Sequence, residues 1–238
     1  MPRSISAEPE PPKVALLIET SRGYGRQLLW GIVRYARLHG PWRFYLTPGD
    51  FAQALPQMSQ WRGSGIIARI ETVEMARAIL AARVPTIALD ASQSLPIQEP
   101  RIARFCEVAS DSHAAARLAA EHLLERGFRH YAFVGEPDRK WSHNREQGFR
   151  QRLREAGFEP LTYRWPSGVR KRRWEREQPV LGQWLRELPK PVGILACNDD
   201  RGRQVLDACR ACGVAVALGG GGGGGGDGGV LCGLAEPP

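Results

Sequence analysis

Polar side chains gather at four places where a short apolar run ends. The first group follows residues 13–19 and includes Tyr24 and Arg26. An aromatic ring can stack on the apolar face of a sugar, and a guanidinium can donate hydrogen bonds to hydroxyls or a carboxylate. Side chains of these two types at the end of a strand can therefore serve a polar ligand. Tyr24 has an equally good alternative role, as a packing residue at the start of a helix.

The second group is Trp141-Ser142-His143-Asn144-Arg145, which pairs an aromatic ring with a guanidinium again. We expect the following helix to begin near Asn144, which would place Arg145 in its first turn. The helix macrodipole disfavours a cation in that turn, so we expect Arg145 to have some other partner. Solvation at the surface is the alternative.

The third group is Asn198 and Asp199, directly after the apolar run 193–197, and the fourth is Asp111. Asn and Asp side chains at such positions can cap the following helix by accepting a backbone N–H. Their oxygens can equally accept hydrogen bonds from a polar ligand. For Asp111 we expect capping; for Asn198 and Asp199 both roles stay open.

Motifs for catalysis are absent from this sequence. The five histidines show no metal-ligand spacing, and no GxSxG nucleophile motif occurs. Gly23 and Gly25 begin a dinucleotide fingerprint, but Leu28 occupies its third glycine position. We therefore expect no enzyme, no metal and no cofactor. A hydrolase or transferase on the same frame stays an alternative, because a fold does not dictate a function.

Short apolar runs alternate with segments of helical spacing along the whole chain, which predicts an α/β fold with parallel, doubly wound sheets. Ligands of such sheets bind outside the carboxyl ends of the strands, where the four polar groups lie. The predicted strands are 13–19, 43–46, 65–70, 86–89, 105–109, 131–134, 161–165 and 193–197, and the predicted helices are 24–39, 52–61, 73–82, 112–126, 145–156, 177–188 and 200–212.

Three stretches carry a resemblance to a known family. They are DSHAAARLAAEHLLERGFRHYAFVG (111–135), the arginine–glycine pair Arg145 and Gly148, and GRQLLWGIVRYA (25–36). Together they resemble the effector-binding domain of LacI/GalR-type bacterial regulators. The resemblance implies a two-lobed, periplasmic-binding-protein-like type I fold with a ligand cleft between the lobes. It also implies a small sugar as effector, a pentose such as xylose. The residues it marks as ligand contacts are Tyr24, Arg26, Arg145, Asn198 and Asp199.

On this basis we expect a flexible lead-in over 1–12, a first lobe over 13–127 and a second, incomplete lobe over 128–216. Residues 217–229 include eight consecutive glycines, which bury no apolar surface and carry a large backbone-entropy cost, so we expect disorder there. A residual segment, 230–238, follows and suits the family again. A reading-frame shift or sequencing fault is our hypothesis for the glycine tract.

Charge and cysteine content place weaker bounds on function. The chain has 33 basic and 25 acidic residues, a formal charge of +8, spread mostly as single arginines. The one dense basic cluster, 170–173, is interpreted as a solvated loop, with nucleic-acid contact as the alternative. An odd count of five cysteines favours a reducing cytoplasm, and Cys209 and Cys212 are interpreted as buried small side chains. No apolar run is long enough to cross a bilayer.

The function predicted from these features is sugar sensing for a bacterial transcriptional regulator. In the branch of the family that responds to xylose, a pair of AraC-like helix-turn-helix units follows the effector domain. We therefore expect operator DNA to be bound only through units beyond this chain, in a homodimer, without any membrane. Two alternatives stay open: a sugar-binding protein with no DNA role, and a nonfunctional frameshifted fragment.

Overall fold

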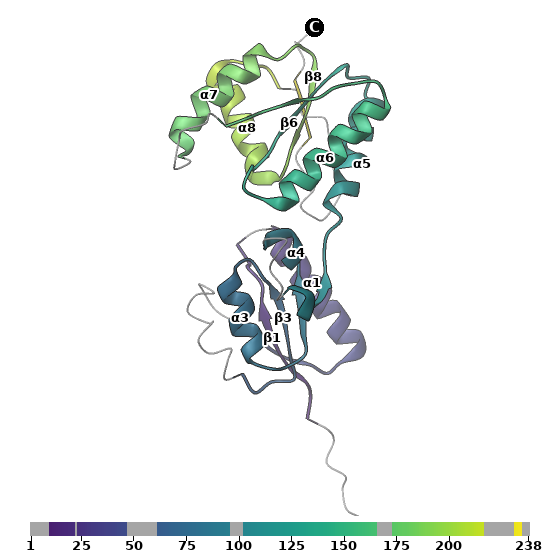
Figure 1. Cartoon of the computed structure of the whole chain (residues 1–238), viewed down its shortest axis with the longest axis vertical. Coiled ribbons are helices and arrows are strands. Elements are labelled where there is room, and N and C mark those ends of the chain that lie inside the picture. The colour runs from purple at the N-terminus through teal and green to yellow at the C-terminus, as the bar shows by residue number, and fades with distance from the viewer. Residues whose placement is uncertain are drawn as a thin grey trace, which may run out of the picture. The chain divides into compact units, whose positions relative to one another are not determined.

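The computed structural model describes residues 10–21, 23–46, 61–95, 102–165, 173–216 and 231–234. The predicted helix 52–61 except its last residue, most of the basic cluster 170–173, and the glycine tract 217–229 lie outside the described residues. The chain divides into two compact units, which we call unit 1 (residues 1–110) and unit 2 (residues 111–238). Figure 1 shows the helices and strands of each unit.

Unit 1 contains a sheet of five parallel strands in the order β2-β1-β3-β4-β5. The strands are β1 (Lys13–Leu17), β2 (Arg43–Leu46), β3 (Gly65–Arg69), β4 (Thr86–Leu89) and β5 (Cys106–Val108). All four pairings are parallel, as the near-continuous apolar runs predict. The carboxyl ends of the five strands therefore lie along one edge of the sheet.

Helices cover both faces of this sheet. Helix α1 (Gly23–His39) packs its apolar side on Val14, Leu16 and Ile67, and α3 (Val73–Ala81) covers the opposite face. Figure 1 shows these helices on either side of β1 and β3. Two short elements that the apolar spacing did not predict follow β4, namely α4 (Ala91–Ser94) and a 3₁₀ turn (Ile102–Arg104).

Unit 2 contains a second sheet in the order β7-β6-β8-β9. Its strands are β6 (His130–Val134), β7 (Leu161–Thr162), β8 (Val192–Ala196) and β9 (Leu231–Leu234). The pairings of β6 with β7 and β8 are parallel, whereas β9 runs antiparallel to β8. This last pairing departs from the wholly parallel sheets that we predict from the sequence.

The described part of unit 2 also contains the helices α5 (Ser112–Glu125), α6 (Lys140–Glu155), α7 (Trp174–Glu187) and α8 (Asp199–Cys212). Alternate residues of β6 and β8 face the two sides of the sheet. One side packs on α7 and α8, and the other on α5 and α6. The two helix pairs flank the strands in Figure 1.

The predicted boundary between the lobes, at residue 127, is wrong by one helix. The chain divides after residue 110, and α5 belongs to unit 2. The reason is close packing: a Cβ on Gly148 of α6 would lie 2.2 Å from the carbonyl oxygen of His113 in α5. Ala116 and Ala120 of α5 are buried in the same cluster as Phe149 of α6. Small residues on both helices let their backbones approach.

The predicted start of α6 is also wrong. The helix begins at Lys140 and not near Asn144, so Arg145 lies in its second turn. Arg139, at the N-cap, makes no side-chain capping bond, and the first residues have modest helix propensity, so local signals for this start are weak. Tertiary contacts supply what is missing. Trp141 packs on the core of unit 2, and the buried Ser142 hydroxyl accepts from the backbone N–H of Glu136 at 2.8 Å.

Candidate functional site

In unit 1, Tyr24 meets the carboxyl ends of three strands. Its hydroxyl donates to a carboxylate oxygen of Asp90, just after β4, at 2.5 Å. The Ser110 hydroxyl, two residues after β5, lies 3.0 Å away. The guanidinium carbon of Arg69, at the end of β3, lies 5.0 Å from the centre of the Tyr24 ring. Burial and the hydrogen bond to Asp90 raise the pKa of Tyr24 to about 12.

Arg26 does not join this cluster. Its side chain is exposed, and one guanidinium nitrogen donates to the backbone carbonyls of Thr20 and Ser21, at 3.0 and 2.7 Å. These contacts stabilise the loop between β1 and α1. Gly25 lets this loop close tightly, because a Cβ there would lie 1.7 Å from the carbonyl oxygen of Glu19.

In unit 2, the predicted pair Trp141 and Arg145 does come together. The guanidinium carbon of Arg145 lies 5.2 Å from the centre of the Trp141 ring, within the range of a cation–π contact. One terminal nitrogen of Arg145 donates to the carbonyl of Cys197, directly after β8. The guanidinium is thus held at the carboxyl end of the sheet. Its Nε is buried and has no hydrogen-bond partner among the described residues.

Asn198 and Asp111 both cap helices. The Asn198 side-chain oxygen accepts from the backbone N–H of Arg201 at 2.8 Å, and Asp111 accepts from that of Ala114 at 2.8 Å. Asp199, the first residue of α8, is exposed. The capping role that we expect for Asp111 is confirmed. For Asn198 the cap is present, and one lone pair of its side-chain oxygen and the amide NH₂ stay outside this bond.

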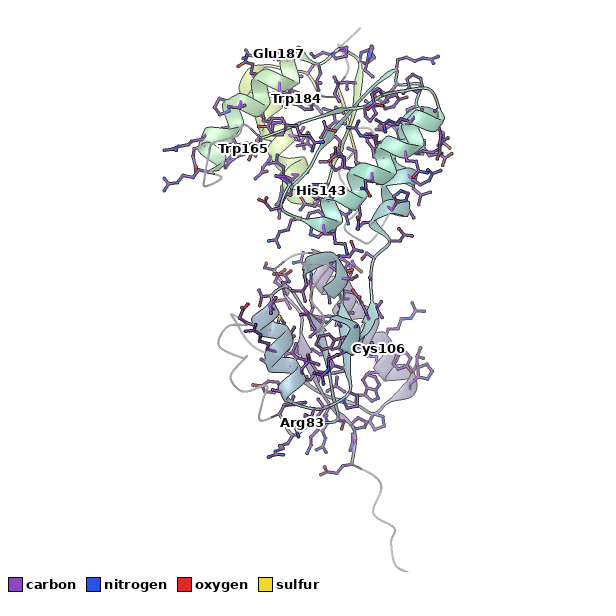
Figure 2. The ribbon with its side chains drawn as sticks, viewed as in Figure 1. Arg83, Cys106, His143, Trp165, Trp184 and Glu187 are labelled. Carbon is purple, nitrogen blue, oxygen red and sulfur yellow. The ribbon has the colours of Figure 1, made fainter. Side chains whose placement is uncertain are left out.

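An open pocket lies in unit 2, beyond the carboxyl ends of β6 and β7. Both its charges and its aromatic ring suit a polar guest. Glu146 accepts from Arg164 at 2.7 Å and from the Thr162 hydroxyl at 3.0 Å, so these charged groups are ordered. Figure 2 shows His143 at the start of α6 and Trp165 after β7, in the same unit. The residues that line this pocket include Glu136, His143, Glu146, Thr162, Arg164 and Trp165.

Sequence reasoning missed several of these residues. Arg69 and Asp90 lie at the carboxyl ends of predicted strands, and this position could have marked them as candidate site residues. Neither belongs to a run of polar residues, so the sequence pattern did not single them out. Trp165 ends the run that we interpreted as a strand. Arg201 lies two residues after Asp199, yet nothing local indicates its partner. Its guanidinium pairs with Glu177 of α7 at 2.7 Å, and both side chains are almost fully buried.

Among the described residues there is no group of three or more His, Cys, Asp or Glu side chains that could hold a metal ion. Within the same residues, no helix is both long and apolar enough to cross a membrane. Cys209 is buried, as interpreted, and Cys212 is half-buried. Burial raises the pKa of the Cys197 thiol, beside Arg145, to about 11, which keeps it protonated.

Comparison with known proteins defines the class. Residues 13–113 match the XylR N-terminal domain, and residues 120–217 match the periplasmic binding protein-like domain. A protein from Alkaliphilus metalliredigens, described as a periplasmic binding protein/LacI transcriptional regulator and complexed with D-xylulofuranose, shares the fold. It has 20% identity and a TM-score of 0.59, over 86% of this chain and 74% of its own. The chain therefore has the two-lobed, periplasmic-binding-protein-like fold of LacI-type regulators.

Within that class the chain is homologous to xylose operon regulatory proteins. It is 28% identical to the one from Escherichia coli K12 over 83% of this chain, and 30% identical to the one from Haemophilus influenzae over 86%. A structure described as the xylose-binding transcription activator XylR matches with a TM-score of 0.70 and 26% identity, over 87% of this chain and 52% of its own. The chain spans about half the length of these relatives, 50% and 52% of the two curated proteins.

Proposed function

We propose that this chain is the sugar-sensing part of a bacterial transcriptional regulator and that its effector is a pentose, with D-xylose as the first candidate. The observation that carries the proposal is Arg145. Its guanidinium is fixed at the carboxyl end of β8 by a backbone carbonyl and by Trp141, and its buried Nε lacks a partner among the described residues. A ligand hydroxyl would satisfy this donor. The homology to xylose operon regulatory proteins supports the choice of sugar.

The candidate contacts come from strand ends in both units. In unit 2 they are Trp141, Arg145, Asn198 and Asp199, and we add Trp165, which lines the pocket beyond β6 and β7, as a stacking surface. In unit 1 the candidate is Arg69, whose guanidinium lies beside the Tyr24 ring and whose Nε pairs with the Glu71 carboxylate at 3.3 Å. Ligand contacts of Tyr24, Arg26 and Asp111 stay a prediction. The polar groups of those three side chains already have protein partners.

Effector binding would act by differential affinity for two arrangements of the protein, since a ligand shifts an equilibrium only by that difference. Operator binding would belong to AraC-type units of the full-length regulator, working as a homodimer. An operator-length DNA duplex should then bind this chain only weakly and with strong salt dependence. Specific binding of the duplex to this chain at physiological salt, measured by fluorescence anisotropy, would refute the assignment of operator binding to the AraC-type units.

Calorimetric titration tests the sugar proposal directly. D-xylose should bind, and L-arabinose, D-ribose and D-glucose should bind more weakly. Because a hydrogen bond to a charged group contributes about 1.5–3 kcal/mol, Arg145→Ala should weaken D-xylose binding by about 10- to 150-fold. Arg154→Ala, an exposed arginine of the same helix that pairs with Glu159, is the matched control and should bind as the wild type does. If no sugar binds, or if both variants bind equally well, the proposal fails.

A further inference from the structure

Asp90 occupies the N-cap position of α4, but its carboxylate makes no capping bond. The side chain is buried, with 7% of its surface exposed, and its backbone is left-handed, with φ of 51°. Aspartate is among the few residues besides glycine that adopt this conformation. A buried carboxylate that its own helix does not use indicates that other contacts hold it there.

Those contacts converge on the last residue of unit 1. One carboxylate oxygen of Asp90 accepts from the backbone N–H of Ser110 at 2.8 Å. The other accepts from the Tyr24 hydroxyl, which also lies 3.0 Å from the Ser110 hydroxyl. The backbone N–H of Asp90 donates to the carbonyl of Val108 at 3.0 Å. Ser110 is therefore tied to α1 and to β4 through both its backbone and its side chain.

Asp111, the next residue, makes its hydrogen bonds within unit 2. The carboxylate of Asp111 accepts from the backbone N–H of Ala114, and its carbonyl accepts from that of Ala115 at 3.0 Å. Both bonds belong to the first turn of α5, which packs on α6. The boundary between the units falls between these two residues. Each side of a single peptide link is thus held by its own unit.

We propose that Tyr24, Asp90 and Ser110 form a hinge anchor, which confines rotation between the units at this crossing to the backbone bonds that join Ser110 to Asp111. Tyr24 is then a positioning residue, because its hydroxyl holds the junction. The anchor also links the junction to two elements whose ends carry candidate effector contacts: α1, after the β1 loop, and β4, which pairs with the strand that ends in Arg69. A change at those strand ends would reach the hinge through Asp90.

Nuclear magnetic relaxation of the backbone amides in the whole chain tests this proposal without any sugar. In the wild type, Ser110 and Ala114 should have order parameters of rigid backbone, about 0.85, with any decrease confined to Asp111. Asp90→Ala should lower the Ser110 value below about 0.6 and raise the hydrogen-exchange rate of its amide at least tenfold. Tyr24→Phe, a milder variant that keeps the Asp90–Ser110 bond, should change both in the same direction by less.

Glu107→Gln is the matched control, because this neighbouring carboxylate accepts from the backbone N–H of Ser92, whereas the backbone N–H of Ser110 donates to Asp90. It should leave Ser110 rigid. A mobile Ser110 in the wild type, or an unchanged one in Asp90→Ala, would overturn the proposal. So would a loss of order in Asp90→Ala that extends equally through β3 and β4, because that would show a general role in folding. None of these outcomes depends on whether D-xylose binds.

Discussion

The buried ion pair between Arg201 and Glu177 joins α8 to α7, and Glu177→Gln should destabilise unit 2 strongly. The side chains are 3% and 4% exposed. Arg201 also donates to Gln204 at 2.6 Å, and its guanidinium lies 6.0 Å from the centre of the Tyr163 ring. Its Nε has no partner among the described residues, so the charge is already poorly solvated.

Removing the carboxylate charge would leave this guanidinium buried without a counter-ion. Breaking a buried pair in this way costs about 3–5 kcal/mol, which is a large part of the 5–15 kcal/mol that stabilises a typical domain. Asp207→Asn is the matched control on α8, the helix of Arg201, because Asp207 pairs with Arg210 while both side chains are largely exposed. An exposed pair contributes about 0–1 kcal/mol.

Urea denaturation followed by far-ultraviolet circular dichroism measures both changes as shifts in the free energy of unfolding. Replacing both partners in Glu177→Gln/Arg201→Met should recover part of the loss, because the uncompensated charge is then gone. A loss below about 1 kcal/mol for Glu177→Gln, equal to that of the control, would refute the reasoning. It would mean that water or a rearranged side chain solvates Arg201.

Three further predictions concern single residues. Gly148→Ala should destabilise unit 2 by about 1–3 kcal/mol, because the added Cβ would meet the His113 carbonyl. Gly31→Ala, in open space on α1, should instead stabilise unit 1 by about 0.5–1 kcal/mol. Thermal unfolding of the two variants measures both changes. Asn198→Ala should cost about 0.5–2 kcal/mol through the lost cap, and a loss of D-xylose affinity beyond that of an equally destabilised variant would show a ligand contact as well. Because the folded-state pKa of Tyr24 is raised to about 12 from 10.0, its contribution to stability is complete below pH 10 and is lost as the pH rises towards 12. Tyr24→Phe should therefore lose less stability than the wild type between pH 10 and 12, and equal losses in alkaline urea titrations would contradict this.

Local sequence determined most of the secondary structure. The alternation of apolar runs and helical spacing predicts the parallel sheet of unit 1 and the parallel core of unit 2, because side-chain periodicity reports which face each element buries. Helix caps are equally local. Asp111 and Asn198 stand three residues before the N–H groups that they accept from, so their type and position suffice to predict the bond.

Tertiary structure decided the features that join distant segments. Tyr24 and Asp90 are 66 residues apart, and Arg201 and Glu177 are 24 apart, so no local pattern predicts either contact. The membership of α5 in unit 2 depends on the missing Cβ of Gly148, which is visible only once the two helices pack. A sequence shows which groups could bond, but burial and competing partners select among them, and both are properties of the folded chain.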